Sequence, residues 1–536
     1  MRTFRSRIPL VFTMVLLTAQ LCAGTPPKLI VVVAIDQMRG DHLTRYASLY
    51  SAGFTRLTTE GLYFPVADLN YAGTATGPGH ATLGTGVYPW KSGIVANKYE
   101  ERATGAKVYC VADSLAAPVD GLCGSMSPRN LLVPGFTDWL KSASPRSRVI
   151  SISYKDRAAV LMGGKKPDGA YWFDRVAGGM GTSSYYMGRL PGWVREFNAS
   201  GWIEAHLPSA WTKLLPEDAY TRFGPDDMPG EPLWQGTRTF PHAIEPHRKV
   251  ARLFSTPWGN EYLLDFAKAA IAAEKLGRGP QPDVLWVSLS TTDDIGSEFG
   301  PNSHEMIDNL VRIDRALGGF LAYLDATFGR GGAVVALSGD HGVMQMPEYL
   351  VRFEGITARR LNNEELLSAA VKKVDAAIGR ELGVETRMVK SGKIDEQLIV
   401  HAGGNLNRVQ HQVREALLGV DGVADVYFKS ELLDPASPDR PYLALFRHSY
   451  NEERSPDYLI RDCEYCLVGS DTTGSSHGTP YVYDRVVPLV FWGTGRPPLR
   501  IERTVHTVDL AATLAKMLEV PMPAWIDGVP LQEVVE

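Results

Sequence analysis

The residues best suited to chemistry in this sequence are carboxylates and imidazoles that follow apolar runs or lie in a glycine-rich stretch. They are Asp36, Asp293, Asp340, His341 and His477. Oxygen and imidazole ligands without a thiolate suit catalytic zinc, although other divalent metals accept them too. A single strand-end carboxylate or histidine is more often a helix cap or a structural residue. Several such clusters in one chain instead predict a metal centre, provided that the fold brings them together.

A threonine is the candidate nucleophile. Thr76 precedes Gly77, Pro78 and a helix that we expect from His80 onward. Proline suits the first turn of a helix, and free N–H groups there stabilise an anion, so a phosphate is expected beside the hydroxyl. Threonine is a poor nucleophile at its own pKa and needs a metal or an adjacent base. The alternative is that Thr76 is only an N-cap residue.

Five apolar, β-branched runs are expected to form the strands that position these residues. They cover 29–35, 148–153, 284–289, 333–338 and 486–492. Helical patterns lie between them, the clearest being the apolar stripe of Met306, Leu310, Ile313, Leu317, Leu321 and Leu324. Alternating strands and helices predict an α/β fold, a mostly parallel central sheet with helices on both faces. Because ligands bind outside the carboxyl ends of such strands, the polar residues after the strands should converge there.

The stretch from about 357 to 449 interrupts this pattern. Amphipathic helices are expected at 364–382 and 406–418, with short strand-like runs around them. We therefore expect an inserted α+β subdomain at 357–449 that caps the site. The catalytic domain would comprise 25–356 and 450–536.

The amino terminus has the pattern of a secretory signal peptide. Three arginines without an acid precede an apolar run at 8–21, and small residues follow it. An uncleaved membrane anchor is the alternative, but the run is shorter than the ~20 residues that span a bilayer. We expect residues 1–24, including Cys22, to be removed and the protein to be periplasmic or secreted, with no stable membrane anchor. Losing three arginines shifts the formal net charge from -5 to -8, and no basic stripe indicates nucleic acid as the main partner.

The four remaining cysteines form two local pairs, Cys110 with Cys123 and Cys463 with Cys466. An oxidising compartment favours a short-range disulfide within each pair. A zinc site built from all four cysteines is the alternative.

One set of motifs spans nearly the whole chain. It consists of Asp36, Thr76-Gly-Pro-Gly-His, Asn97, Lys155-Asp-Arg157, Asp293, Asp340-His341 and His477-Gly-Thr-Pro. In combination these motifs resemble the threonine-nucleophile alkaline phosphatases of the PafA type, within the alkaline phosphatase superfamily. The resemblance extends from about residue 29 to residue 531. Each motif is weak by itself, whereas the combination is specific.

The resemblance implies hydrolysis of phosphate monoesters through a phosphothreonine at Thr76, with two zinc ions. The first zinc would favour the Thr76 alkoxide, and the second would stabilise the leaving oxygen. The implied ligands of the first zinc are Asp36, Thr76, Asp340 and His341, and those of the second include Asp293 and His477. Asn97 would donate to a nonbridging phosphate oxygen.

Lys155 and Arg157 favour a monoesterase. They lie two positions apart, so we expect them on one side of an extended segment, clamping the remaining phosphate oxygens. A monoester dianion exposes three nonbridging oxygens, whereas a diester has a second substituent in that space. The related nucleotide pyrophosphatase/phosphodiesterases share the threonine and the metal ligands but lack this cationic pair. The ordinary alternative for such residues is a solvated strand face.

Position 297 departs from the family pattern. The family has Asp-x-x-Gly-His, and this chain reads Asp293-Asp-Ile-Gly-Ser297, so a hydroxyl replaces an expected imidazole ligand. Several groups are alternatives for completing the second zinc site: Ser297 binding weakly, Asp294, a water or His304. A poorly filled second site is a further alternative.

Three functions from different classes follow. An exported alkaline phosphatase acting on small-molecule phosphate monoesters is favoured. A phosphodiesterase or nucleotide pyrophosphatase on the same scaffold is the second. A phosphate-binding pseudoenzyme, which lost turnover with the imidazole at position 297, is the third.

Overall fold

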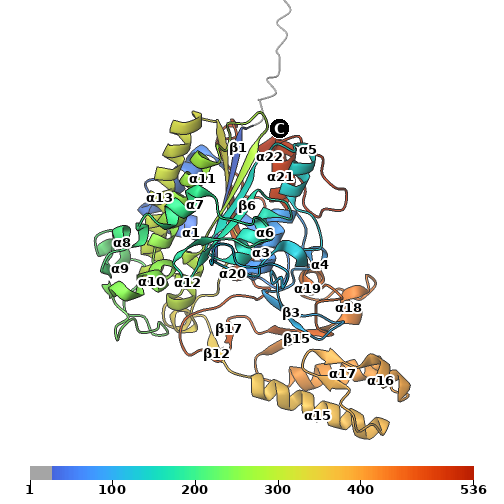
Figure 1. The fold of residues 1–536 in the computed structure, drawn as a ribbon. Helices are drawn as coiled ribbons and strands as arrows, with labels where there is room; N and C mark the ends of the chain where they lie inside the picture. Colours follow the sequence, from blue (N-terminus) through green and yellow to red (C-terminus); the bar gives the residue numbers. More distant parts are fainter. Residues whose placement is uncertain (1–26) are drawn as a thin grey trace, which may run out of the picture.

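A ten-stranded sheet runs through the centre of the protein (Figure 1). The computed structural model describes residues 27–536, so the expected signal peptide at 1–24, with Cys22, lies outside the described residues. Within 27–536, no helix is long and apolar enough to cross a membrane.

The five expected strands all form and are neighbours in this sheet. They are β5 (Val149–Ser153), β10 (Asp283–Leu289), β1 (Leu29–Ile35), β11 (Ala333–Gly339) and β18 (Val486–Trp492). The first four are parallel in the order β5-β10-β1-β11, whereas β18 is antiparallel to β11. Further strands extend the sheet on both sides, namely β6 (Gly169–Asp174), β7 (Gly179–Gly181), β2 (Leu62–Asp68), β19 (Leu499–Arg500) and β20 (Val505–His506). The sheet is therefore mostly parallel, as expected.

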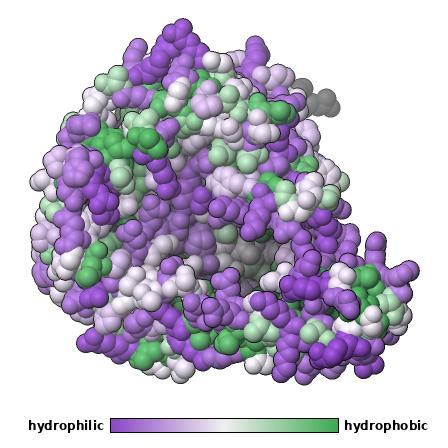
Figure 2. All heavy atoms as spheres, turned by 60° about the horizontal axis from the view of Figure 1, so that its bottom comes forward, coloured by the Kyte–Doolittle hydropathy of each residue, from purple (hydrophilic) through white to green (hydrophobic). Residues whose placement is uncertain are grey.

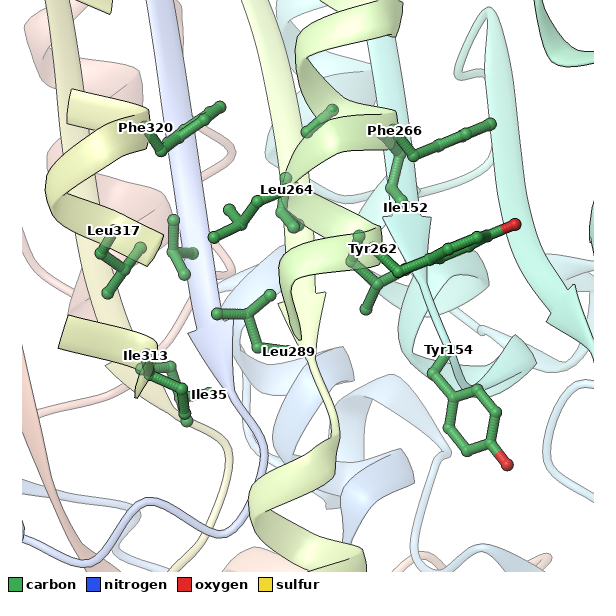
Figure 3. Packing of buried hydrophobic residues seen from close by; sticks show 14 of the residues in the cluster. Ile35, Ile152, Tyr154, Tyr262, Leu264, Phe266, Leu289, Ile313, Leu317 and Phe320 are labelled. Carbon is green, nitrogen blue, oxygen red and sulfur yellow. The ribbon is translucent and has the colours of Figure 1, made fainter. Parts of the chain in front are cut away.

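The central strand β1 is completely buried because both faces of the sheet are covered by helices. Its odd-numbered residues join one apolar cluster and its even-numbered residues join another, as the two-residue repeat of a strand requires. Helices α11 (Trp258–Ala273) and α13 (His304–Phe328) cover the first face, where Leu264, Leu317 and Phe320 pack against the strands (Figure 3). The second face is covered by α3 (Thr76–Thr85), α5 (Phe136–Ala143), α6 (Asp156–Gly163) and α21 (Asp509–Met517).

A smaller unit lies beyond the carboxyl ends of the strands, at the bottom of Figure 1. It contains α15 (Glu364–Leu382) and α17 (Leu406–Leu418), which have the expected bounds, and the antiparallel pair β15 (Val423–Phe428) and β16 (Tyr458–Asp462). These elements share an apolar cluster separate from those of the large sheet. We call this unit the cap. The strand β16 follows residue 449, yet it pairs with β15 of the cap. The expected subdomain bounds of 357–449 remain a prediction.

One of the two expected disulfides forms. Cys463 and Cys466 are bonded, whereas the expected pairing of Cys110 with Cys123 is wrong, because both are free thiols. The Cys110 sulfur packs beneath Gly77, and the Cys123 thiol donates to the carbonyl of Trp172. The two thiols therefore have different partners in the core.

Candidate active site

The register of the central strands brings the candidate residues to one edge of the sheet. Ile35 at the end of β1 lies beside Leu289 of β10 and Gly339 of β11. The three strands therefore end together, and Asp36 and Asp340 follow them directly. The backbone N–H of Asp36 also donates to the carbonyl of Leu289 at 2.9 Å, which holds the strand ends together beyond the last pair.

Asp36, Asp340 and His341 form the first group of metal-binding character. One ligand atom from each lies within 4.8 Å of the others, and all three side chains are buried. The Oδ1 of Asp36 and the Nε2 of His341 lack a hydrogen-bond partner. The Oδ2 of Asp36 and the Oδ2 of Asp340 have only ion-pair contacts, with Lys155 at 2.5 Å and with the Nδ1 of His80 at 3.1 Å. Buried polar atoms without partners are costly, and a divalent cation would satisfy all of them at once. The donor set therefore fits a metal.

Asp293, His477 and the same His341 form the second group. The rings of His341 and His477 stack with centroids 3.7 Å apart, and the Nε2 of His477 lies 3.7 Å from Asp293. The other ring nitrogen of His477 is 2.7 Å from the carbonyl of Thr74, which orients the imidazole. Burial, with the neighbouring His341, lowers the pKa of His477 to about 4, so this imidazole is neutral at physiological pH and able to bind a metal.

Lys155 lies between the two groups. Its ammonium pairs with Asp36 at 2.5 Å and with Asp293. Burial alone would lower the pKa of Lys155, but the carboxylates of Asp293 and Asp36 hold it above its usual range. Likewise burial would raise the pKa of Asp293, but Lys155 and then His477 hold it well below. Burial and the Asp340 carboxylate instead raise the pKa of Asp36 well above its usual range. Lys155 is thus the positive charge that offsets this carboxylate cluster.

Thr76 is the first residue of α3, so the helix begins four residues earlier than expected. The expected backbone anion site remains a prediction, but few N–H groups could form it. The N–H of Gly77 donates to the Oδ1 of Asn97 at 2.7 Å, Pro78 has no N–H, and the N–H of Gly79 donates to the carbonyl of Ala75. Of these first-turn groups only the N–H of Thr76 has no acceptor within residues 27–536, so a phosphate would also need side-chain donors.

Two such side chains lie at the start of α3, one beside the Thr76 hydroxyl and one beside the N–H of Gly77. The Nη2 of Arg157 lies 3.2 Å from the Thr76 Oγ1. Asn97 accepts from Gly77 through Oδ1, which leaves its Nδ2 amide group to donate elsewhere. The hydroxyl of Tyr109 donates to Asp156 at 2.5 Å and lies 3.4 Å from Arg157. Asp156 thereby positions Tyr109, which in turn contacts the guanidinium of Arg157.

Lys155 and Arg157 are not on an extended segment. Lys155 is the N-cap of α6, and Arg157 lies in the first turn of that helix. The chain turns into the helix directly after β5, so residues two apart point in different directions. Arg157 faces Thr76, whereas Lys155 faces the carboxylates. The expectation of two cations on one side of a strand is therefore wrong.

Ser297 lies one helical turn after Asp293 in α12 (Thr291–Phe299), and its hydroxyl donates to that carboxylate at 3.3 Å. Gln37, which follows Asp36 with a positive φ of 63°, donates through Nε2 to both Asp293 and Ser297. His304 is not recruited, since its Nε2 is 2.9 Å from the carbonyl of Gly224 and its Nδ1 faces Asp226. Burial raises the pKa of Asp294 to about 6. The amide of Gln37 is thus the group that links Asp293 and Ser297.

Gln37, Tyr109 and His80 are site residues that sequence reasoning missed. His80 is buried, with Nδ1 2.9 Å from the carbonyl of Thr76 and 3.1 Å from Asp340, and Nε2 2.9 Å from the hydroxyl of Ser288. It lies four residues after Thr76, so the helical spacing within Thr-Gly-Pro-Gly-His was a usable signal. Gln37 and Tyr109 gave no comparable signal. The contacts of Gln37 depend on its own positive φ, and those of Tyr109 depend on the position of the hairpin that carries it.

The sequence and the fold of this chain are similar to those of known proteins. Residues 30–479 match the family described as type I phosphodiesterase/nucleotide pyrophosphatase. A protein of Myroides odoratus named calcium-transporting ATPase is 36% identical over 95% of each chain. Alkaline phosphatase PhoV of Synechococcus elongatus is 34% identical over 93% of this chain and 91% of its own. The crystal structure of alkaline phosphatase PafA superposes with a TM-score of 0.86 at 31% identity, over 96% of this chain and 100% of that one.

Proposed function

This chain belongs to the type I phosphodiesterase/nucleotide pyrophosphatase family of the alkaline phosphatase superfamily, and we propose that it hydrolyses phosphate monoesters with Thr76 as the nucleophile. The chain is an alkaline phosphatase, a phosphoric monoester hydrolase similar in sequence to PhoV and PafA over almost its full length. The substrates are small-molecule phosphate esters. The single observation that carries the choice of nucleophile is the Arg157 guanidinium 3.2 Å from the Thr76 hydroxyl, in the helix whose His80 lies 3.1 Å from Asp340.

Two divalent metals, which we propose to be zinc, fit the donor set. Asp36, Asp340 and His341 would hold one of them with the Thr76 oxygen, and Asp293 and His477 would hold the other. When bound, the metals lower the pKa of a coordinated hydroxyl and offset negative charge on the leaving oxygen. The buried carboxylate and imidazole atoms without hydrogen-bond partners support this proposal.

The side chains around Thr76 supply binding and orientation. The Thr76 Oγ forms the bond to phosphorus as the bond from phosphorus to the leaving oxygen breaks, and water then releases phosphate from the threonine. Arg157 pairs with nonbridging oxygens through a planar guanidinium, and the Asn97 amide donates a further hydrogen bond. These contacts strengthen as charge moves onto the phosphoryl oxygens, so they contribute mainly in the transition state.

Lys155 stabilises the carboxylates rather than the hydroxyl. Its ammonium offsets Asp36 and Asp293, two of the proposed metal ligands. Because it is buried at the centre of the site, it also adds positive charge to the field that a phosphate dianion meets. We therefore propose that Lys155 favours phosphate binding through its charge, and that Arg157 makes the direct contact with the phosphate.

Export to the periplasm or beyond is part of the proposal. The amino-terminal pattern at 1–24 supports it, and the disulfide between Cys463 and Cys466 agrees with an oxidising compartment. No helix of residues 27–536 could span a membrane, and the chain has an acidic formal net charge of -5.

Trapping the intermediate tests the nucleophile. Acid-quenched enzyme, supplied with zinc and a monoester, should carry phosphate on the peptide that contains Thr76, and Thr76→Ala should abolish both the label and turnover. The substitution removes a small side chain, so the melting temperature should change little. Full turnover by Thr76→Ala, or phosphate on another residue, would show that the nucleophile is misassigned.

A further inference from the structure

A groove of about 1020 Å³ separates the catalytic unit from the cap. One wall is the hairpin of β3 (Lys98–Glu100) and β4 (Lys107–Tyr109), and the opposite wall includes Ser391, Gly392, Lys393 and the strand β16 of the cap. Figure 2 shows the molecule hollowed on this face, with hydrophilic residues lining much of the hollow. The volume is at the upper end of the range of small-molecule sites.

The groove adjoins the proposed active site. Tyr109 lines it, and the hydroxyl of this tyrosine lies 3.4 Å from Arg157. Ala96 and Lys98, on either side of Asn97, also line it. So do Gly478 and Thr479, which directly follow His477. The part of a bound substrate that extends from the phosphate toward the cap would therefore lie in this groove.

The charge of the groove is opposite to that of the whole chain. Its lining includes six basic side chains against three acidic ones, although the chain has a formal net charge of -5. The basic residues are Lys98, Arg102, Lys107, Lys393, Arg454 and Arg461, and the acidic ones are Glu100, Asp457 and Asp462. A concave surface lined by one sign of charge concentrates ligands of the other sign. The groove therefore attracts anions.

Most of these cations already have partners. Arg102 pairs with Asp457, and Lys393 of the cap pairs with Glu100 of the hairpin. Lys98 and Lys107 form no ion pair within residues 27–536. Because Lys98 is paired with Tyr109 and Lys107 with Glu100 across the hairpin, all four side chains lie on the same face of it, and all four residues line the groove. The two ammonium groups without an ion pair, those of Lys98 and Lys107, thus lie on the same face of the hairpin as Tyr109, whose hydroxyl is 3.4 Å from Arg157.

We propose that this groove is a second anion subsite, in which Lys98 and Lys107 bind a negatively charged group on the leaving alcohol of the substrate. The preferred substrates are then monoesters whose alcohol carries a further phosphate or carboxylate. This inference rests on the proposed monoesterase function. The phosphate to be cleaved lies at Thr76 and Arg157, and the second anion lies outward along the hairpin.

A matched substrate pair tests the subsite. We would compare kcat/KM for 3-hydroxypropyl phosphate and for propane-1,3-diyl bisphosphate, corrected for its two equivalent phosphates. The wild type should prefer the bisphosphate, and the double variant Lys98→Gln/Lys107→Gln should lose about tenfold of kcat/KM on the bisphosphate with less than a twofold change on the monophosphate. The wild-type preference should also fall as salt is added, because exposed lysines are screened.

The control is Lys372→Gln/Lys373→Gln, which removes the same charge from exposed positions on α15 outside the groove. It should leave the ratio of the two kcat/KM values unchanged. An unchanged ratio in the groove variant, or an equal fall in both double variants, would overturn the subsite. Failure of the wild type to hydrolyse either compound would instead count against the proposed monoesterase function.

Discussion

At the scale of single residues, the position of the missing imidazole is occupied by a network of hydroxyl and amide groups. Gln37 donates to Asp293 at 2.6 Å and to Ser297 at 3.0 Å, so both side chains are held without a metal. An imidazole is a stronger zinc ligand than a neutral hydroxyl. The second metal is therefore expected to bind more weakly than the first, which has three buried ligands.

We predict that Ser297→His tightens the second metal by about tenfold or more. Zinc would be titrated into chelator-treated wild type and variant while the bound metal is measured by a competing chelator dye, with monoester turnover followed in parallel. Ser297→Ala is the control, because it removes the hydroxyl without adding a ligand. Two tight metals in wild type and no gain in the variant would mean that another residue already completes the site.

The convergence of Asp36 and Asp340 was predictable from residue type and strand position, since both directly follow strands that end together. Their roles as metal ligands, and that of Thr76 as nucleophile, rested on the family resemblance and remain predictions. The pairing of Lys155 with Asp36 was not predictable, because it depends on how α6 turns away from β5. The same turn separates Lys155 from Arg157. Sequence spacing predicts such directions only inside a regular element.

At the scale of secondary-structure elements, α3 packs against the end of β11 through a glycine. A Cβ added to Gly79 would lie 2.3 Å from the carbonyl oxygen of Asp340 and 2.8 Å from its Cβ. This contact fixes the distance between the helix that carries Thr76 and the strand end that carries Asp340. The close approach requires a residue without a side chain.

Gly79→Ala should therefore displace α3 and lower kcat/KM for a monoester by 100-fold or more, because a ~1 Å misplacement of reacting groups can cost about that much. The melting temperature should fall as well. Gly319→Ala in α13 is the control, since nothing lies within 4 Å of the added Cβ. That substitution should raise the free energy of unfolding by roughly 0.5–1 kcal/mol and leave kcat/KM unchanged. Wild-type kinetics in Gly79→Ala would contradict this role of the helix.

Element type and extent were largely predictable from periodicity. The bounds of β1, β18, α15 and α17 agree with those expected from the apolar pattern, because each element is regular and buries one face or both. The start of α3 was misplaced because Pro78 was taken to precede the helix, whereas it is the third residue of it. The pairing of Cys110 with Cys123 failed for a different reason: nearness in sequence does not imply nearness of sulfur atoms in the core.

At the scale of the whole molecule, a buried histidine makes stability depend on pH. Burial lowers the pKa of His42 from 6.5 to about 4, and the side chain is fully buried. Between these values the unfolded state binds more protons than the folded state, so stability falls as the pH falls. The difference between 6.5 and about 4 corresponds to ~3 kcal/mol.

We predict that His42→Gln removes this dependence. The free energy of unfolding of wild type minus that of the variant should rise by up to about 3 kcal/mol from pH 4 to pH 7, measured by urea denaturation. Other buried groups titrate in this range too, and the difference between the two proteins cancels their contribution. A constant difference across the range would mean that His42 is not the group responsible.

The most direct test of the monoesterase assignment is the ratio of kcat/KM for an aryl phosphate to that for the matching aryl methyl phosphodiester. Zinc-loaded wild type should favour the monoester strongly if Arg157, 3.2 Å from the Thr76 hydroxyl, binds nonbridging oxygens as proposed, because a diester has one fewer of them and carries less charge. Arg157→Ala should lower kcat/KM for the monoester by ~100-fold and change that for the diester much less. Faster turnover of the diester by wild type, or equal losses on both substrates in the variant, would contradict the account and favour a phosphodiesterase.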